Sequence, residues 1–380
     1  MAWEKDLDRW VEALLIDPLT ADRIRQFEES SGKPRLRWPA ILAVSFGAVM
    51  LCAGILLFVA AHWDQIAPWQ RFSLVLAMVG IFHLAAVFLG EKVPAMGVAL
   101  HVAGTACLGA GIYLAAQIFN LEEHWPTGLL LWSLGAVIAW LILRQWPQAL
   151  LAAILIPWWL TGEWDLATEN YNHSWNIVAQ GLLLLSILYL TTTTRKESNR
   201  HLRLGLVWVG ALALIPLLVD VIATAQRDNW FWGGYGQRMP DSLSFIGYAG
   251  AYGSILAIAA IARRKRAVPV FVAAAWVLGL AIVAGKGHLD SNLLLYVWIA
   301  LGACAFCYWG VAENRKLFIN YGTAIFALDL IAFYFSSVLD KLGRSMGLIL
   351  LGVIFLAGGW ILNRLRTDLI ARAAAAGAVR

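Results

Sequence analysis

The chain has 380 residues, of which 61% are hydrophobic and only 14% charged, whereas soluble globular chains are about half apolar and about a quarter charged. Long apolar stretches recur along most of the sequence, which excludes a soluble enzyme held by a single membrane helix. The net charge of +5 comes from basic residues in short loops between apolar stretches, so nucleic acid is not an expected partner. We therefore expect an integral protein of the lipid bilayer.

Residues 1–38 are predicted to form a short helical hairpin. An apolar stripe recurs at helical spacing on its first helix, formed by Trp3, Leu7, Trp10, Val11 and Leu14. Asp17 and Pro18 end that helix, and Thr20 is the expected N-cap of a second helix that passes Phe27. The stripe either packs the two helices together, lies on the membrane surface, or binds a cytoplasmic protein through Trp3, Leu7 and Trp10.

Residues 39–364 are predicted to form an all-α polytopic bundle, and residues 365–380 a short basic tail. Twelve apolar segments follow one another at 40–61, 72–89, 97–119, 127–143, 147–161, 177–191, 204–224, 243–261, 268–284, 293–312, 317–338 and 346–362. About 20 helical residues, each rising about 1.5 Å, cross a hydrocarbon core of about 30 Å. The fifth segment is short and contains Pro157, so it is either a span or a re-entrant element.

The distribution of basic residues predicts the orientation. Lys and Arg favour cytoplasmic loops, and each added span reverses every later loop. With twelve spans and a cytoplasmic N-terminus, most of the 29 basic residues lie on the inner side. Without the fifth span, the basic runs at 195–203 and 263–266 would lie outside. We therefore expect twelve spans with both termini cytoplasmic.

Two stretches carry a resemblance to a known family. They read ILLFVAAHWDQIAPWQRF at 55–72 and GAGIYLAAQIFNLEEHWPTGLLLWSLGAVIAWLILRQWPQALLAAILIPWWLTGEW at 109–164. Together with the N-terminal hairpin, they resemble a family of predicted bacterial multi-pass membrane proteins, domain of unknown function 2157, over about residues 5–165. The resemblance implies a protein of the bacterial inner membrane. The family supplies no catalytic residues to carry over.

The predicted outer loops combine tryptophans with carboxylates. The candidate residues are Trp63, Asp64, Glu122, Glu123, His124, Trp125, Glu163, Trp164 and Asp165. Flat aromatic rings stack on the C–H faces of sugars while polar side chains take the hydroxyl groups, so these loops suit sugar-like or zwitterionic headgroups. The alternative is an ordinary aromatic belt, because Trp and Tyr collect at the water interface of membrane proteins.

Few ionisable residues fall inside the apolar segments. Asp329 lies near the middle of its segment and Asp220 closer to the outer surface, four residues after Pro216. A charge in the bilayer usually faces the bundle interior or a hydrated cavity, so both are candidates for a solute pathway. His83 and His101 flank one short inner loop and are expected at a similar depth. The alternative is that each polar group only hydrogen-bonds a neighbouring helix.

No motif fixes a reaction. Gly-rich nucleotide loops, nucleophile elbows and metal-ligand spacings do not occur, so no catalytic residue, metal or other cofactor is predicted. The favoured function is binding or translocation of a small polar solute or lipid-linked headgroup from the outer side. The alternatives are a non-catalytic scaffold that recruits a cytoplasmic partner through residues 1–38, and a membrane enzyme that acts on a lipid-linked glycan.

Overall fold

The computed structural model describes residues 7, 9–30, 46, 50, 67–118, 124–171, 174–192, 199–230, 237, 239–286, 293–338, 352, 364, 367 and 368. All the named elements in these ranges are helical, apart from one isolated bridge between Tyr171 and Gln237. The all-α prediction is therefore confirmed for this part of the chain. Two compact units, residues 1–71 and 72–380, are distinguished by their contacts. The predicted boundary at residues 38 and 39 lies outside the described residues.

The first unit contains helix α2 (Pro18–Ser30), preceded by helical residues 9–12. Asp17 is its N-cap: the Thr20 backbone N–H donates to Asp17 Oδ2 at 3.1 Å, and the Thr20 hydroxyl donates to Asp17 Oδ1 at 2.5 Å. The prediction of Thr20 as the N-cap was wrong. Pro18 fits the first helical position because its φ is fixed and it has no N–H to satisfy, so the helix begins before Thr20.

The predicted apolar stripe is only partly formed. Leu7 is 1% exposed and is buried, as is Ala21 of α2. Trp10 is 42% exposed and Leu14 is 91% exposed. The helical residues end at 12, and Leu14 adopts a left-handed φ of 56° in the following turn, so it leaves the face to which Leu7 belongs.

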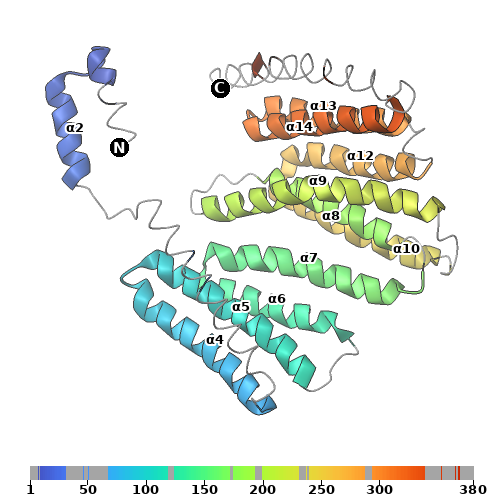
Figure 1. Ribbon diagram of the computed structural model, residues 1–380, viewed down its shortest axis with the longest axis horizontal. Helices are drawn as coiled ribbons and strands as arrows, with labels where there is room; N and C mark the ends of the chain where they lie inside the picture. Colours follow the sequence, from blue (N-terminus) through green and yellow to red (C-terminus); the bar gives the residue numbers. More distant parts are fainter. Residues whose placement is uncertain are drawn as a thin grey trace. The chain divides into compact units, whose positions relative to one another are not determined.

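The second unit is a series of helices that run back and forth (Figure 1). In chain order they are α4 (Pro68–Gly90), α5 (Pro94–Ile118), α6 (Pro126–Leu143), α7 (Trp146–Thr168), α8 (Ser174–Leu190), α9 (Arg200–Trp230), α10 (Asp241–Tyr248), η4 (Ala249–Gly253), α11 (Ser254–Arg263), η5 (Arg264–Ala267), α12 (Val268–Ala284), α13 (Leu293–Ala312), α14 (Lys316–Phe333) and η7 (Tyr334–Val338). The π-helical turn η4 joins α10 and α11 into one helical stretch.

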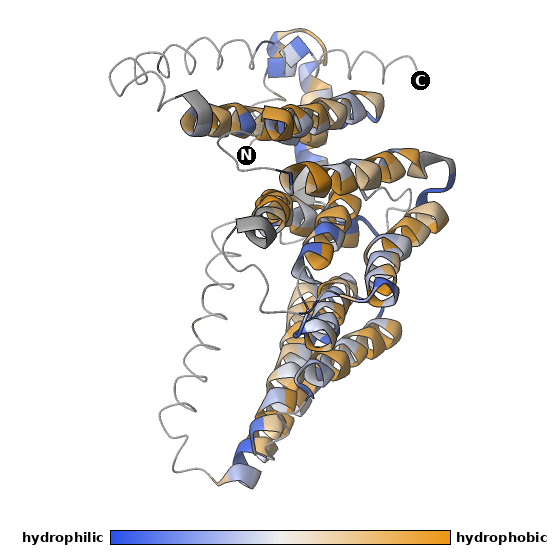
Figure 2. Ribbon diagram, turned by 90° about the vertical axis from the view of Figure 1, so that its right-hand side faces the viewer, coloured by the Kyte–Doolittle hydropathy of each residue, from blue (hydrophilic) through white to orange (hydrophobic). Residues whose placement is uncertain are grey.

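Seven helical stretches among the described residues are long and apolar enough to cross a membrane. They are Pro68–Gly90, Pro94–Gln117, Pro126–Leu143, Arg200–Ala225, Asp241–Arg263, Leu293–Ala312 and Lys316–Ser336. Only 6–33% of the residues in their apolar windows are buried, and Figure 2 shows hydrophobic residues along most of the length of the described helices. Continuous apolar surface of this kind suits contact with lipid tails.

The remaining predicted segments have different outcomes. Segments 177–191 and 268–284 correspond to the 17-residue helices α8 and α12. The fifth segment is longer than predicted, because α7 has 23 residues and continues through Pro157. Segments 40–61 and 346–362 lie outside the described residues, apart from the isolated positions 46, 50 and 352.

Among the described helices of the second unit, α8 has the largest share of buried residues. Leu183, Leu184 and Leu190 are at most 1% exposed and belong to a core shared with α9, α12 and α13. Helix α9 approaches α8 closely at Gly210, where an added Cβ would collide with backbone atoms of Ser186 and Leu190. Small residues at such positions let membrane helices pack through their backbones.

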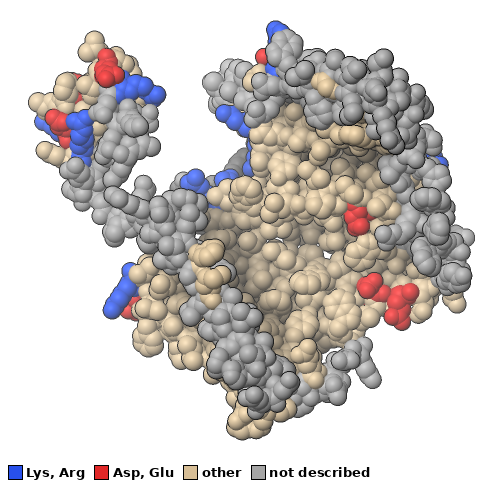
Figure 3. All heavy atoms as spheres, in the orientation of Figure 1, with Lys and Arg blue, Asp and Glu red and all other residues tan. Residues whose placement is uncertain are grey.

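The two ends of this unit differ in charge. The end at which α6 begins is called the His124 end, and charged residues there whose side chains are described include Glu163, Asp165, Glu169, Asp220, Asp241 and Lys286. The opposite end is called the Arg263 end, and charged residues there whose side chains are described include Glu91, Lys92, Arg144, Arg200, Arg203, Arg263, Arg264, Glu313, Arg315 and Lys316. Figure 3 shows the same separation, with mainly basic side chains on the left of this unit and acidic ones on the right.

Candidate functional site

A cavity with a volume of 670 Å³ lies among α4, α5 and α6 and is called the α4–α6 groove. Its walls are mostly apolar, with Phe72, Leu108 and Leu131 among the lining side chains. Polar groups lie where α5 ends and α6 begins, and they include Gln117 and His124. The groove is therefore apolar along its length and polar at its His124 end.

The His124 end of the groove brings together residues from two predicted outer loops. His124 Nε2 lies 3.1 Å from Glu163 Oε2 at the far end of α7. Glu163 Oε1 accepts a hydrogen bond from Trp159 Nε1 at 2.8 Å. Trp125, which also lines the groove, lies so close to α7 that a Cβ added at Gly162 would be 2.7 Å from its ring. The structure thus places three of the predicted candidates, His124, Trp125 and Glu163, at one position.

The neighbouring candidates Trp164 and Asp165 lie on other faces of α7. The Trp164 indole N–H donates to the Ser174 carbonyl oxygen at 3.0 Å, and its ring covers Gly247, where an added Cβ would collide with it. Trp164 therefore connects α7 to α8 and α10. Asp165 is exposed and does not line the groove.

Asp220 belongs to a second polar cluster, which joins α8, α9 and η4. The Trp175 indole N–H donates to Asp220 Oδ2 at 3.2 Å, and the Thr224 hydroxyl donates to the Asp220 carbonyl oxygen at 2.7 Å. Asn176 Nδ2 lies 3.0 Å from the Thr224 hydroxyl. This cluster is hydrogen-bonded within the bundle and does not contribute to the lining of the α4–α6 groove.

The same cluster continues towards the middle of the bundle. Gln180 Nε2 donates to Asn176 Oδ1 at 2.5 Å, and Tyr252 Oη donates to Gln180 Oε1 at 2.7 Å. Gln180 is 1% exposed, and Tyr252 lies in the π-helical turn η4. Because a buried amide without partners is costly in an apolar medium, these bonds satisfy Gln180 and connect α8 to η4.

Asp329 lies apart from both features, in α14. Its Oδ1 atom is shielded from solvent and has no hydrogen-bond partner among the described residues. It is one helical turn beyond Ile325, which lines a second cavity between α8, α9, α12, α13 and α14. Neither Asp329 nor Asp220 lines either cavity, so the two carboxylates and the His124 cluster do not share one vestibule.

His83 and His101 meet between α4 and α5, as their positions beside one short loop predicted. Their Nδ1 atoms are 2.9 Å apart, so one ring donates and the other accepts. Gly104 leaves room for the His83 ring, because a Cβ there would be 2.7 Å from His83 Nε2. Within the described ranges no group of three or more metal-ligating side chains is found.

Sequence reasoning missed Trp159, Asn176, Thr224 and Tyr252. A usable signal was present for part of the second cluster, because Asn176 and Gln180, and likewise Asp220 and Thr224, are separated by four residues and share a helix face. The predicted candidates Trp63, Asp64, Glu122 and Glu123 lie outside the described residues.

The apolar helices, their outward-facing apolar side chains and the separation of charge between two ends define a membrane-embedded helical protein. Residues 8–149 match the model of a family described as "Predicted membrane protein (DUF2157)". The resemblance inferred from the sequence is therefore confirmed over that segment. No curated protein matches the chain, and no solved structure matches it.

Proposed function

We propose that this protein binds an amphipathic molecule in the α4–α6 groove, with its apolar tail between the helices and its polar headgroup at the His124 end. One observation carries the proposal: His124, Trp125 and Glu163 come together where a mostly apolar cavity of 670 Å³ reaches the end of the bundle. Ligand sites usually combine apolar walls with a few polar groups that fix orientation.

The composition of the groove favours a lipid-linked headgroup over a free polar solute. Side chains such as Phe72 and Leu108 offer no hydrogen bonds to a solute inside the cavity, and burying unpaired polar groups there is costly. Glu163 accepts hydrogen bonds, His124 can donate one, and Trp125, which is 41% exposed, offers a ring face to a sugar. These groups suit a sugar-like or zwitterionic headgroup.

We also propose that the second unit spans the bacterial inner membrane with the Arg263 end in the cytoplasm, as part of a twelve-span bundle with both termini inside. The concentration of Lys and Arg at that end supports this orientation. It places His124 and Glu163 on the extracytoplasmic side. Labelling of whole cells with a membrane-impermeant maleimide tests it: R264C stays unlabelled, whereas D165C reacts.

The test of binding uses a photoreactive alkyl maltoside, which has a sugar headgroup and a diazirine on its alkyl tail. The protein is held in phosphatidylcholine nanodiscs, and labelled peptides are mapped by mass spectrometry. We expect labelling within α4, α5 and α6. Free maltose, which has no tail, is expected to compete poorly because the groove binds mainly the tail.

The matched controls come from α5. Ala116 lines the groove, so Ala116→Phe fills it and is expected to lower labelling about tenfold, equivalent to about 1.4 kcal/mol. Ala110 is exposed on the same helix and is not part of the lining, so Ala110→Phe leaves labelling unchanged. Equal labelling of the two variants, or labelling spread evenly over all helices, contradicts the proposal.

A second candidate function, the scaffold, is favoured by the hairpin of the first unit. Large apolar side chains are exposed around its turn: Leu14 is 91%, Leu15 72% and Leu19 62% exposed. Leu7 is buried, so a partner would contact the turn and Trp10 rather than Leu7. If the protein acts as a scaffold, combined substitution of Leu14 and Leu15 by Ser abolishes recruitment of a cytoplasmic partner. The same substitution leaves maltoside labelling of the α4–α6 groove unchanged.

A further inference from the structure

The Arg263 end contains a buried guanidinium whose hydrogen bonds are unmet. The Arg263 side chain is 5% exposed, and within the described part of the chain its Nη1 and Nη2 atoms have no hydrogen-bond partner. Among the described residues, Glu313 places its Oε1 atom 3.9 Å from Nη1. Burying an ion without hydrogen bonds costs free energy, so a hydrogen-bond acceptor beside the Arg263 guanidinium would be stabilising.

Basic charge exceeds acidic charge around Arg263. Arg315 interacts electrostatically with the same carboxylate, and its Nη2 atom donates to the Thr192 carbonyl oxygen at 3.1 Å. Burial lowers the pKa of Arg315, Glu313 raises it, and the charge of Arg203 lowers it further. Arg263 and Arg315 thus both interact with the one carboxylate of Glu313, and Arg203 acts on Arg315. That carboxylate is also engaged by Trp309, whose Nε1 donates to Glu313 Oε1 at 2.8 Å.

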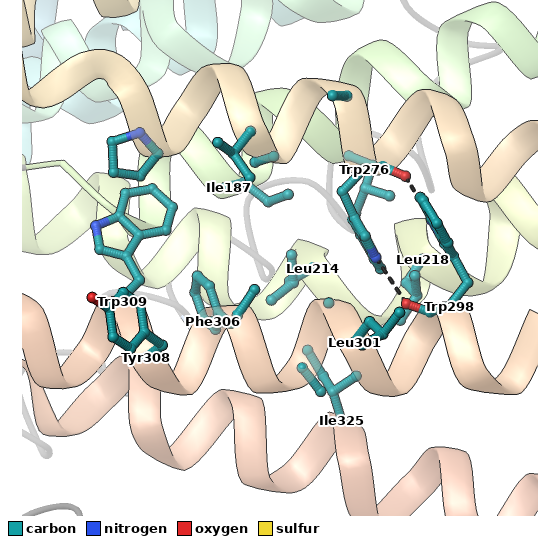
Figure 4. Close-up of a pocket in the computed structure, with 18 of the residues that line it drawn as sticks. Ile187, Leu214, Leu218, Trp276, Trp298, Leu301, Phe306, Tyr308, Trp309 and Ile325 are labelled. Atoms are coloured by element: carbon teal, nitrogen blue, oxygen red, sulfur yellow. Dashed lines mark hydrogen bonds between the residues drawn. The ribbon is translucent and has the colours of Figure 1, made fainter.

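An apolar groove begins directly beside this cluster. The Arg263 guanidinium carbon lies 5.5 Å from the centre of the Trp309 ring, and Trp309 lines a cavity of 580 Å³ between α8, α9, α12, α13 and α14. We call this cavity the α12–α14 groove. Figure 4 shows Trp309 at one end and the Trp276–Trp298 pair at the other. The pair is joined by two reciprocal hydrogen bonds of 2.9 and 3.0 Å.

We propose that the α12–α14 groove holds an acyl chain of an anionic phospholipid, whose phosphate accepts hydrogen bonds from Arg263 and Arg315. The buried Arg263 nitrogens supply the charge complementarity, and an Arg fork matches phosphate oxygens. Basic pockets between membrane helices bind anionic headgroups in this way. The apolar lining selects a lipid over free phosphate, because only a lipid has a tail to place beside Phe306 and Leu301.

The site is separate from the proposed function. It lies at the Arg263 end, whereas the α4–α6 groove has its polar groups at the His124 end, and the two cavities share no lining residue. Failure of one proposal therefore leaves the other standing.

The experiment measures binding of dioleoyl phosphatidylglycerol by native mass spectrometry of the full chain, with dioleoyl phosphatidylcholine as the neutral lipid. We expect phosphatidylglycerol to bind about tenfold more tightly. Arg263→Met removes most of this preference, whereas Arg263→Lys keeps part of it because it retains the charge without the fork. Arg144→Met is the matched control, since Arg144 is an exposed basic residue of the same end.

The tail is tested on α13. Ala305 lines the α12–α14 groove, and Cys304 beside it is exposed and does not. Ala305→Phe is expected to lower phosphatidylglycerol binding about tenfold, and Cys304→Phe to leave it unchanged. Thermal unfolding in phosphatidylcholine verifies that each variant is folded, and added phosphatidylglycerol raises the melting temperature of wild type but not of Arg263→Met.

Three results would overturn the proposal. An equal loss of the preference for phosphatidylglycerol in Arg263→Met and Arg144→Met would mean that the lipid is attracted to a basic surface in general. Equal binding of the two lipids would mean that the headgroup is not recognised. Displacement of phosphatidylglycerol by inorganic phosphate at matched ionic strength would mean an anion site without a tail.

Discussion

The contact between His124 and Glu163 allows ligand binding to be separated from stability. Their side chains are 52% and 33% exposed, and ion pairs of this exposure contribute about 0–1 kcal/mol to folding. Glu163→Gln removes the carboxylate charge but keeps an oxygen to accept the Trp159 indole N–H. We therefore expect Glu163→Gln and His124→Gln each to change the free energy of unfolding by less than about 1 kcal/mol.

The effect on the ligand is expected to be larger. A hydrogen bond to a charged group contributes about 1.5–3 kcal/mol, so either substitution should weaken maltoside labelling about tenfold or more. The assay is a titration of photolabelling yield against probe concentration in nanodiscs, beside an unfolding titration of the same samples. In a double-mutant cycle, the double variant should bind the maltoside only slightly more weakly than the single variant with the lower affinity, because the two side chains act on one headgroup.

Two results would exclude a headgroup contact at His124 and Glu163. Unchanged labelling in both single variants would mean that no headgroup contacts His124 or Glu163. A fall in the free energy of unfolding by more than about 2 kcal/mol, with a parallel loss of labelling, would mean that the pair supports the fold and not a ligand.

Three further predictions concern packing, the buried cluster and the hairpin. Gly210→Ala places a methyl group against the backbone of α8 and should lower the free energy of unfolding by about 1–3 kcal/mol. Gly80 has no atom within 4 Å of an added Cβ, so Gly80→Ala should not lower the free energy of unfolding. Equal effects of the two variants in unfolding titrations would be inconsistent with a close approach of α9 to α8. Gln180→Leu removes the hydrogen bonds to Asn176 of α8 and Tyr252 of η4 and should lower the free energy of unfolding by about 1–2 kcal/mol. The same titration measures this loss, and an unchanged free energy of unfolding would argue against a stabilising cluster. Hydrogen bonds from the side chain and backbone of Thr20 lower the pKa of Asp17 below its usual 3.8. The stabilisation of α2 by this cap is therefore complete above pH 3.8 and is lost as the pH falls through the lower pKa of folded Asp17. An amide resonance of Thr20 that titrates at or above pH 3.8 would contradict this prediction.

The helices were predictable because their signal is local. A run of about 20 apolar residues can satisfy its backbone in lipid only as a helix, and this places α4, α5, α6, α9 and α13 from composition alone. The meeting of His124 with Glu163 was predictable in part. The start of α6 and the end of α7 must lie at the same end of a helical hairpin.

The partners of the second cluster were not predictable. Helices that are apolar on all faces give no periodicity that shows which face points inward, so the sequence could not place Tyr252 beside Gln180. That contact depends on α8 packing against η4, where Gly181 lies against Ala251. The cap of α2 was misplaced for a local reason, because Thr20 has the chemistry of an N-cap although Pro18 already begins the helix.

Binding of an amphipathic molecule in the α4–α6 groove is tested most directly by an experimental density map of the protein in nanodiscs that contain an alkyl maltoside. We expect elongated density in the α4–α6 groove, with the headgroup between His124, Trp125 and Glu163. An α4 that packs tightly against α6 and leaves no space for a tail, or density for the headgroup only at other positions, would contradict it.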